Sequence, residues 1–232
     1  MRNFFRTEAD KLKKMNFTDK RQYIWEYYKL HLLFIAVLLF FIGYMINIWF
    51  INPPKRDYLY IAWQAHMVAH DQLGALGDRL SVIVENPERY HVRVQSYALT
   101  GEPQMDQALI TRFFAMMQVG ELHAIITTGD EMLANAYGGL IKPIYPVMDA
   151  LAEINPGLHD YISERLITLT FTPEVSARDG EAETVTEVMS IDLNGVPLLD
   201  ELGFWSEDLY FGLVISSDYY YQLAKALVVL FE

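Results

Sequence analysis

The chain of 232 residues contains no cysteine. It therefore cannot form disulfide bonds, use a thiol as a nucleophile, or hold an iron–sulfur cluster or a cysteine-ligated zinc ion. A lipid-modified N-terminal cysteine is excluded as well, so anything that holds the chain to a membrane must be the polypeptide itself. An extracytoplasmic domain without disulfides favours a bacterial source.

Basic residues are scarce beyond the first 30 positions. That segment holds eight Lys or Arg against four Asp or Glu; of the chain's 18 basic and 30 acidic residues, ten and 26 remain for the other 202 positions, a formal charge of −16. Nucleic acid is not expected as a partner, because binding it requires basic side chains that neutralise phosphates. A hydrophobic fraction of 52% predicts a folded chain rather than a disordered one.

One long apolar run stands out. Residues Leu32 to Ile51 carry no charge, and Asn47 is their only strongly polar side chain. About twenty such residues cross a bilayer core of roughly 30 Å, so the run predicts a transmembrane helix. A buried helix of a soluble domain seldom lacks a polar face over this length. A cleaved signal peptide has a shorter apolar core followed by small residues, whereas Asn52-Pro53-Pro54-Lys55 follows here.

The flanking charges predict the orientation of this helix. Eight basic residues precede the run, against Lys55 and Arg56 directly after it, so the positive-inside rule places the N-terminus in the cytoplasm. We therefore expect a single-pass protein of the cell membrane with the lipid bilayer as a partner. Its predicted parts are a basic cytoplasmic segment (1–30), a transmembrane helix (31–52), a linker (53–57) and an extracellular domain (58–232).

The outer domain begins with alternating strand and helix patterns. Short apolar or alternating runs predict strands, and longer 3.6-periodic runs predict helices. The first five segments are a strand at 58–63, a helix at 66–85, a strand at 90–97, a helix at 103–119 and a strand at 122–127. The second helix has an apolar stripe at Ala108, Phe113, Ala115, Met116 and Val119. Right-handed crossovers between these strands imply parallel pairing.

After Gly138-Gly139 the segments become shorter and richer in proline. Strands are predicted at 165–171 and 185–193, and the polar turn at 178–184 between them indicates a hairpin. A strand at 209–215 and a helix at 218–231 close the chain. The sequence thus predicts an α/β fold, in which the N-terminal transmembrane helix precedes a mixed, mainly parallel sheet with helices on both faces.

Residues 101–144 resemble a segment of bacterial extracellular solute-binding proteins of the type II periplasmic-binding fold. The resemblance lies in Met105-Asp106 near the start of a helix, and in the turn Gly120-Glu121-Leu122-His123 before an apolar strand. His123 stands where that family usually has Asp. The closing segment, 208–232, is similar to the returning strand and helix of such a lobe.

The resemblance implies one lobe rather than a complete clamp. Solute-binding proteins usually hold ligand between two lobes of comparable size, and here only 144–208 remains for a second one. We therefore expect a shortened periplasmic-binding-protein-like lobe. The basic, aromatic segment 23–31 before the apolar run is also similar to uncharacterised membrane proteins of Gram-positive bacteria.

Candidate chemistry is sparse along the chain. His66 and His70 would lie one turn apart on a helix and form half of a transition-metal site, but Met67 stands where the zinc-protease pattern requires Glu. Polar residues that open an ordinary helix are the alternative. No nucleophile-elbow or phosphate-loop motif occurs. We therefore expect no enzyme and no cofactor.

The carboxyl ends of two strands predict a ligand-binding edge. In parallel sheets ligands meet the loops beyond these ends, which here hold Trp63, Gln64, Thr127, Thr128 and Gly129. Trp63 would offer a stacking face, and the Thr-Thr-Gly run would offer hydroxyl and backbone N–H groups. The resembled family usually touches ligand at these positions too.

The sequence therefore predicts a noncatalytic, membrane-anchored extracytoplasmic binding or accessory module, associated with a membrane transporter or similar complex. The alternative is a structural or sensory subunit of a membrane complex that binds no small molecule. A lined cleft at the strand ends would favour the first function, and a filled or flat edge would favour the second.

Overall fold

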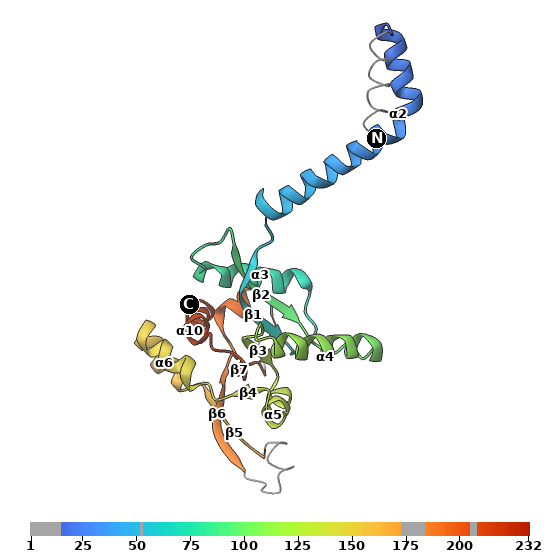
Figure 1. The fold of residues 1–232 in the computed structure, drawn as a ribbon. Helices are drawn as coiled ribbons and strands as arrows, with labels where there is room; N and C mark the ends of the chain where they lie inside the picture. Colours follow the sequence, from blue (N-terminus) through green and yellow to red (C-terminus); the bar gives the residue numbers. More distant parts are fainter. Residues whose placement is uncertain (1–14, 52, 173–183, 205–207) are drawn as a thin grey trace. The chain divides into compact units, whose positions relative to one another are not determined.

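The structure is a computed structural model that describes residues 15–51, 53–172, 184–204 and 208–232. The chain divides into two compact units, Met1–Pro54 and Lys55–Glu232. Figure 1 follows the chain through both units and gives the element labels used below.

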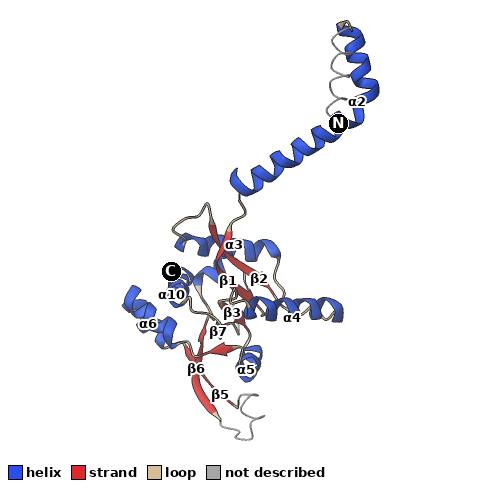
Figure 2. Cartoon of the chain, in the orientation of Figure 1, coloured by secondary structure: helices blue, strands red, loops and turns tan. Residues whose placement is uncertain are grey.

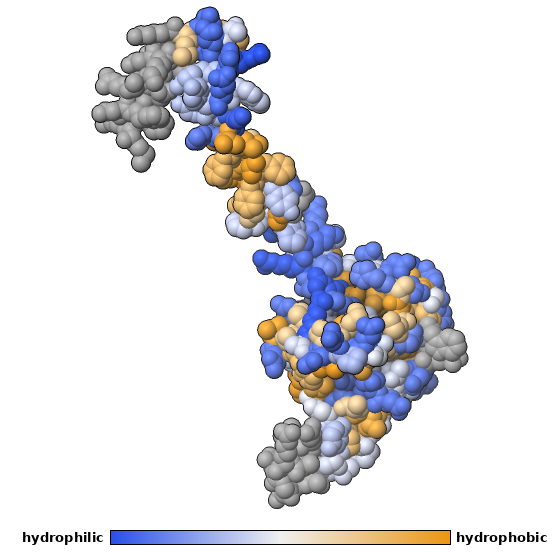
Figure 3. All heavy atoms as spheres, turned by 90° about the vertical axis from the view of Figure 1, so that its right-hand side faces the viewer, coloured by the Kyte–Doolittle hydropathy of each residue, from blue (hydrophilic) through white to orange (hydrophobic). Residues whose placement is uncertain are grey.

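The first unit is built on one long helix. Helix α2 (Phe17–Ile46) begins after Asn16, whose side-chain oxygen accepts a hydrogen bond from the Asp19 N–H at 2.9 Å. It continues into a short π-helical segment, Asn47–Ile51. Among the described residues, the 27-residue stretch Trp25–Ile51 is the one helix that is long and apolar enough to cross a membrane. Its apolar side chains are the orange ones along the helix in Figure 3.

The second unit is built on a seven-stranded sheet with the order β2-β1-β3-β7-β6-β5, in which β4 pairs with β7 (Figure 2). The strands are β1 (Arg56–Trp63), β2 (Tyr90–Ser96), β3 (Ala124–Thr127), β4 (Ile141–Lys142), β5 (Leu166–Phe171), β6 (Val185–Asp192) and β7 (Tyr210–Val214). The helices are α3 (His70–Leu80), α4 (Pro103–Gln118), α5 (Gly129–Tyr137), α6 (Tyr145–Ile154), α7 (Pro156–Ser163), α9 (Pro197–Glu201) and α10 (Tyr220–Phe231), with a 3₁₀ turn at Ser81–Ile83.

The prediction of a mixed sheet in an α/β domain is confirmed, but the parallel part is smaller than predicted. Of the six strand pairings among the described residues, β1 with β2 and β1 with β3 are parallel, and the other four are antiparallel. The reason is that β7, close to the C-terminus, inserts antiparallel beside β3 and then pairs with the β5–β6 hairpin. The turn predicted at 178–184 lies, except for Thr184, outside the described residues.

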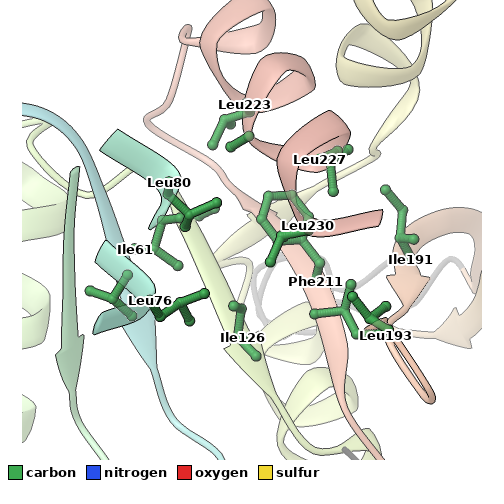
Figure 4. Close-up of a cluster of buried hydrophobic side chains, with 14 of the residues drawn as sticks. Ile61, Leu76, Leu80, Ile126, Ile191, Leu193, Phe211, Leu223, Leu227 and Leu230 are labelled. Carbon is green, nitrogen blue, oxygen red and sulfur yellow. The ribbon is translucent and has the colours of Figure 1, made fainter. Parts of the chain in front are cut away.

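The face of the sheet that carries the larger core is covered by α3, α6, α9 and α10. In β1, Leu59, Ile61 and Trp63 point to this face. Figure 4 shows how the apolar side chains of α3 and α10 meet those of the sheet: Ile61, Leu76, Leu80, Ile126, Ile191, Leu193, Phe211, Leu223, Leu227 and Leu230. Burial of each side chain of this size stabilises the folded state by about 1.5–3 kcal/mol.

The opposite face carries a smaller core beneath α4 and α5. Tyr60 and Ala62 of β1 point to it, since successive side chains of a strand alternate. Helix α4 buries only Phe113 of its 16 residues, so the predicted apolar stripe is wrong at Ala108, Ala115 and Val119, which are exposed. Helices on both faces follow from the strand order, because right-handed crossovers from β1 to β2 and from β2 to β3 run in opposite directions.

Helix α3 packs closely on β2, and two of its glycines give a matched test of that contact. A Cβ on Gly77 would lie 2.7 Å from the carbonyl oxygen of Val92, whereas a Cβ on Gly74 would meet nothing within 4 Å. We expect Gly77→Ala to lower the free energy of unfolding by about 1–3 kcal/mol and Gly74→Ala to raise it by about 0.5–1 kcal/mol. Denaturant unfolding of both variants would measure this. Equal effects would contradict the close packing.

Candidate functional site

The strand order creates a crevice between β1 and β3. The chain leaves β1 towards β2, and it leaves β3 through α5 towards β4, which pairs with β7 on the other side. The two outgoing connections therefore diverge, while the carboxyl ends of the parallel strands β1 and β3 share one edge. In open α/β sheets such a point is where ligands bind.

A pocket of about 520 Å³ lies at this edge. Small-ligand sites typically have about 300–1,000 Å³, so its size suits a small molecule or one or two large side chains. Its lining comes from the loops after β1 and β2, from α4 and α5, and from the residue before β4: Gln64, Ala65, His66, Tyr97, Leu99, Leu109, Ile110, Phe113, Phe114, Thr128, Glu131, Asn135 and Leu140.

Helix α4 supplies an apolar wall. Leu109, Ile110, Phe113 and Phe114 all line the pocket, and their spacing of one and four positions places them on one side of a helix. Phe113 is buried against Tyr97, with the ring centroids 5.5 Å apart and the rings edge to face. Ile110 and Phe114 remain 45% and 39% exposed. This wall therefore offers apolar surface that a ligand would cover.

Helix α5 supplies a polar wall. Thr128, Glu131 and Asn135 line the pocket, and their spacing of three and four positions puts them in one row along the helix. Asn135 is 5% exposed, and its Nδ2 donates a hydrogen bond to Oε1 of Gln64 at 2.9 Å. The backbone N–H of Gln64 donates to the carbonyl oxygen of Ile126 at 2.8 Å. The end of β1 thus holds the amide pair in place.

A buried hydrogen-bond network attaches the apolar wall to the sheet. The hydroxyls of Tyr97 and Tyr60 share a hydrogen bond, and the Tyr60 hydroxyl donates to Oε1 of Gln95 at 2.9 Å. The same oxygen accepts from Nη2 of Arg112 on α4, also at 2.9 Å. Burial and the hydrogen bond with Tyr97 raise the pKa of Tyr60. The phenol therefore stays neutral at physiological pH, and the Arg112 guanidinium is the charged member of the network that positions α4.

The charges around the pocket disfavour an anion. Among the described residues that line the pocket, Glu131 is the only carboxylate, and none is Lys or Arg. Burial lowers the pKa of His66, so its imidazole is neutral at pH 7. The N–H of Gly129, at the start of α5, donates to Oδ1 of Asp208 at 3.3 Å. The positive end of this helix, where an anionic ligand would bind, therefore already faces a carboxylate of the chain.

The structure brings two of the five predicted ligand-binding residues to the pocket, Gln64 and Thr128. Trp63 offers no stacking face, because it is fully buried: its ring lies 4.7 Å from that of Phe204, and its Nε1 donates to the carbonyl oxygen of His66 at 2.9 Å. Thr127 is also fully buried, and its hydroxyl has no hydrogen-bond partner among the described residues. Gly129 lies outside the lining.

The predicted metal half-site does not form. Helix α3 begins at His70 rather than at His66, so the two imidazoles do not share a helix face. The hydrogen bond from Trp63 to the carbonyl oxygen of His66 holds residues 64–69 in a loop. Within the described part of the chain, no group of three or more His, Asp or Glu is arranged to hold a metal ion.

Three features of the site were missed from the sequence. Asn135 and Glu131 follow the predicted strand at 122–127, in a stretch where the sequence carries no binding motif. The exposed apolar wall did have a signal, because Phe113 and Phe114 are adjacent and cannot both face the sheet from a helix.

In comparisons with known proteins, no family model, no curated protein and no solved structure matches this chain.

Proposed function

We propose that this chain is a noncatalytic, membrane-tethered binding module that holds a small ligand between α4 and α5. The observation that carries the proposal is the position of the pocket, which opens where the connections of β1 and β3 diverge. This is the place where open α/β sheets bind ligands. We also propose that the fold is similar to one shortened lobe of solute-binding proteins. This similarity agrees with the position of the pocket.

The composition of the pocket supports binding rather than catalysis. Its lining combines apolar side chains with two amides, the hydroxyls of Thr128 and Tyr97, one carboxylate and one neutral imidazole. A nucleophile hydrogen-bonded to a base, the usual sign of covalent catalysis, is not found among the lining residues. A few fixed polar groups over apolar walls are typical of recognition sites.

The proposed location is the cell membrane, with the N-terminus in the cytoplasm and the unit Lys55–Glu232 outside. The apolar helix Trp25–Ile51 is long enough to cross the bilayer. Eight basic residues before it favour the cytoplasm for the N-terminal side. The lipid bilayer is thus the proposed partner of the first unit.

Exposed apolar side chains favour a second candidate function. Leu99, Ile110 and Phe114 are 55%, 45% and 39% exposed around one opening. Such a patch also suits a protein contact. In this alternative the chain is an accessory, structural or sensory subunit of a membrane complex, such as a transporter, and binds no small molecule.

Single-cysteine labelling tests the proposal, since the natural chain has no thiol of its own. Leu99→Cys places a thiol at the pocket, and Thr18→Cys places one at an exposed position of the N-terminal segment. In intact cells we expect a membrane-impermeant maleimide to label Leu99→Cys and to reach Thr18→Cys only after lysis. The reverse pattern would contradict the proposed orientation.

The same variant tests ligand binding in the purified full chain. Members of a fragment library that occupy the pocket should slow maleimide labelling of Leu99→Cys. Tyr145→Cys, at a 49% exposed position on α6 outside the lining, is the control for compounds that act on the reagent or the detergent. If no compound protects Leu99→Cys selectively, the pocket is not a ligand site and the accessory-subunit function is favoured.

A further inference from the structure

The two walls of the pocket differ in chemistry. The α4 wall consists of four apolar residues, and Leu99 and Leu140 add apolar surface elsewhere in the lining. The α5 wall consists of Thr128, Glu131 and Asn135 in one row. A ligand that fits both walls must have an apolar body and a polar group on one side, because an unpaired polar group against the α4 wall would lose its hydration.

The polar wall is rich in hydrogen-bond acceptors. Glu131 provides a carboxylate, which accepts hydrogen bonds only. Thr128 makes no side-chain cap bond to α5, so its hydroxyl oxygen is not used by the helix. Asn135 uses an amino hydrogen to bond Gln64, which leaves the carbonyl oxygen of its amide as an acceptor. A ligand atom that carries several hydrogen-bond donors would match these acceptors.

The charge of that donor group follows from its surroundings. In the part of the chain that the structure describes, no Lys or Arg lines the pocket, and no basic side chain forms an ion pair with Glu131. Asp208 already faces the start of α5. A carboxylate or phosphate on the ligand would meet Glu131 without a compensating cation, whereas an ammonium group would pair with it.

We propose that the pocket binds a molecule with an apolar body and a primary ammonium group, which Glu131 and the Thr128 and Asn135 oxygens receive while the α4 wall covers the body. This inference rests on the proposed function, since it requires that the pocket binds a ligand. The same chemistry has two sources, a small apolar amine and the free N-terminus of an apolar peptide.

The test uses compounds that share one body and differ in their polar end. The probes are 4-phenylbutylamine, 4-phenylbutanol and 4-phenylbutyrate, measured by their protection of Leu99→Cys from maleimide in the purified full chain, with Tyr145→Cys as the control for partition into detergent. We expect the amine to protect at a concentration roughly two- to fivefold lower than the alcohol, as one exposed ion pair allows, and the carboxylate to protect least.

Variants assign the preference to Glu131. Glu131→Gln, made in the Leu99→Cys background, should remove the difference between amine and alcohol while both still bind. Glu153→Gln, at an exposed position of α6 outside the lining, should leave the difference unchanged.

A second pair of probes separates the two sources of the ammonium group. If the ligand is a peptide end, Phe-Leu-amide with a free N-terminus should protect better than 4-phenylbutylamine, and its N-acetylated form should not protect.

The outcomes separate this inference from the proposed function. If the alcohol protects as well as the amine, or if the carboxylate protects best, the pocket still binds ligands but the ammonium inference is wrong. If Glu131→Gln keeps the full preference, the inference is wrong as well. If neither these probes nor any library compound protects Leu99→Cys, both proposals are wrong.

Discussion

Replacing Trp63 by alanine is expected to lower the free energy of unfolding of the α/β unit by about 3–5 kcal/mol. Trp63 is fully buried at the end of β1, where its ring packs against Phe204 at 4.7 Å and against the edge of His66 at 5.6 Å. Its Nε1 also donates to the carbonyl oxygen of His66 at 2.9 Å. Alanine would leave a large cavity and remove the hydrogen bond that holds the loop after β1.

The measurement is denaturant unfolding of the full chain in detergent. Tyr145→Ala removes an aromatic ring that is 49% exposed on α6, and it should change the free energy of unfolding by less than about 0.5 kcal/mol. Trp63→Phe keeps most of the packing, so its loss of unfolding free energy should lie between those of Trp63→Ala and Tyr145→Ala. A loss below about 1 kcal/mol for Trp63→Ala would show that the indole is not buried. Because the variant is destabilised, it cannot serve as a specific test of ligand binding.

The difference between the predicted and observed roles of Trp63 shows what local pattern can and cannot specify. The run from Tyr58 to Trp63 predicts a buried strand, and the strand forms. Whether its last side chain faces a ligand or the core depends on Phe204, which is 141 positions away in sequence and approaches only in the folded chain. No periodicity within β1 contains that information.

The same distinction explains which elements were predicted well. The strands at 90–97 and 122–127 and the closing helix at 218–231 have strong alternation or apolar periodicity, and the structure places β2, β3 and α10 within these ranges. The direction of β7 was not predictable from its residues, because a central strand is apolar whether its neighbour is parallel or antiparallel. The extent of the parallel sheet was therefore overestimated.

One property of the pocket was predictable from the sequence and another was not. Its position followed from the predicted alternation of strands and helices, since the carboxyl ends of parallel strands share an edge. Its polar wall did not, because Asn135 becomes part of the site only through the contact with Gln64, 71 positions earlier. Spacing on a helix can show that Thr128, Glu131 and Asn135 share a row, but not which way that row faces.

Lowering the pH from 7 to 5 is expected to destabilise the α/β unit through His123. This side chain is 4% exposed at the start of β3, and its Nδ1 accepts a hydrogen bond from the backbone N–H of Tyr60 at 2.9 Å. The ring also lies 4.0 Å from that of Tyr219. Burial lowers the pKa of His123 from 6.5 to about 4. A protonated imidazole would lose its acceptor nitrogen and carry an unpaired charge in the core.

The sign of the pH dependence follows from the two pKa values. Between about pH 6.5 and pH 4 the unfolded chain binds a proton at this residue and the folded chain does not, so stability is fully present above 6.5 and is lost as the pH falls towards 4. A depression of this size makes the loss between pH 7 and pH 5 about 2 kcal/mol. Other groups titrate in the same range, so a variant must isolate the contribution of His123.

His123→Asn provides that comparison, because Oδ1 of asparagine can accept the Tyr60 N–H and does not bind a proton in this range. Unfolding free energies at pH 7 and pH 5 should differ by about 2 kcal/mol less in His123→Asn than in the natural chain. His70→Asn, at the exposed start of α3, should keep the natural dependence. If His123→Asn retained it too, the imidazole would be protonated in the folded state at pH 5. His123 joins β1 to β3 at the amino end of β3, opposite to the carboxyl end where the pocket opens, so this substitution changes no residue of the lining.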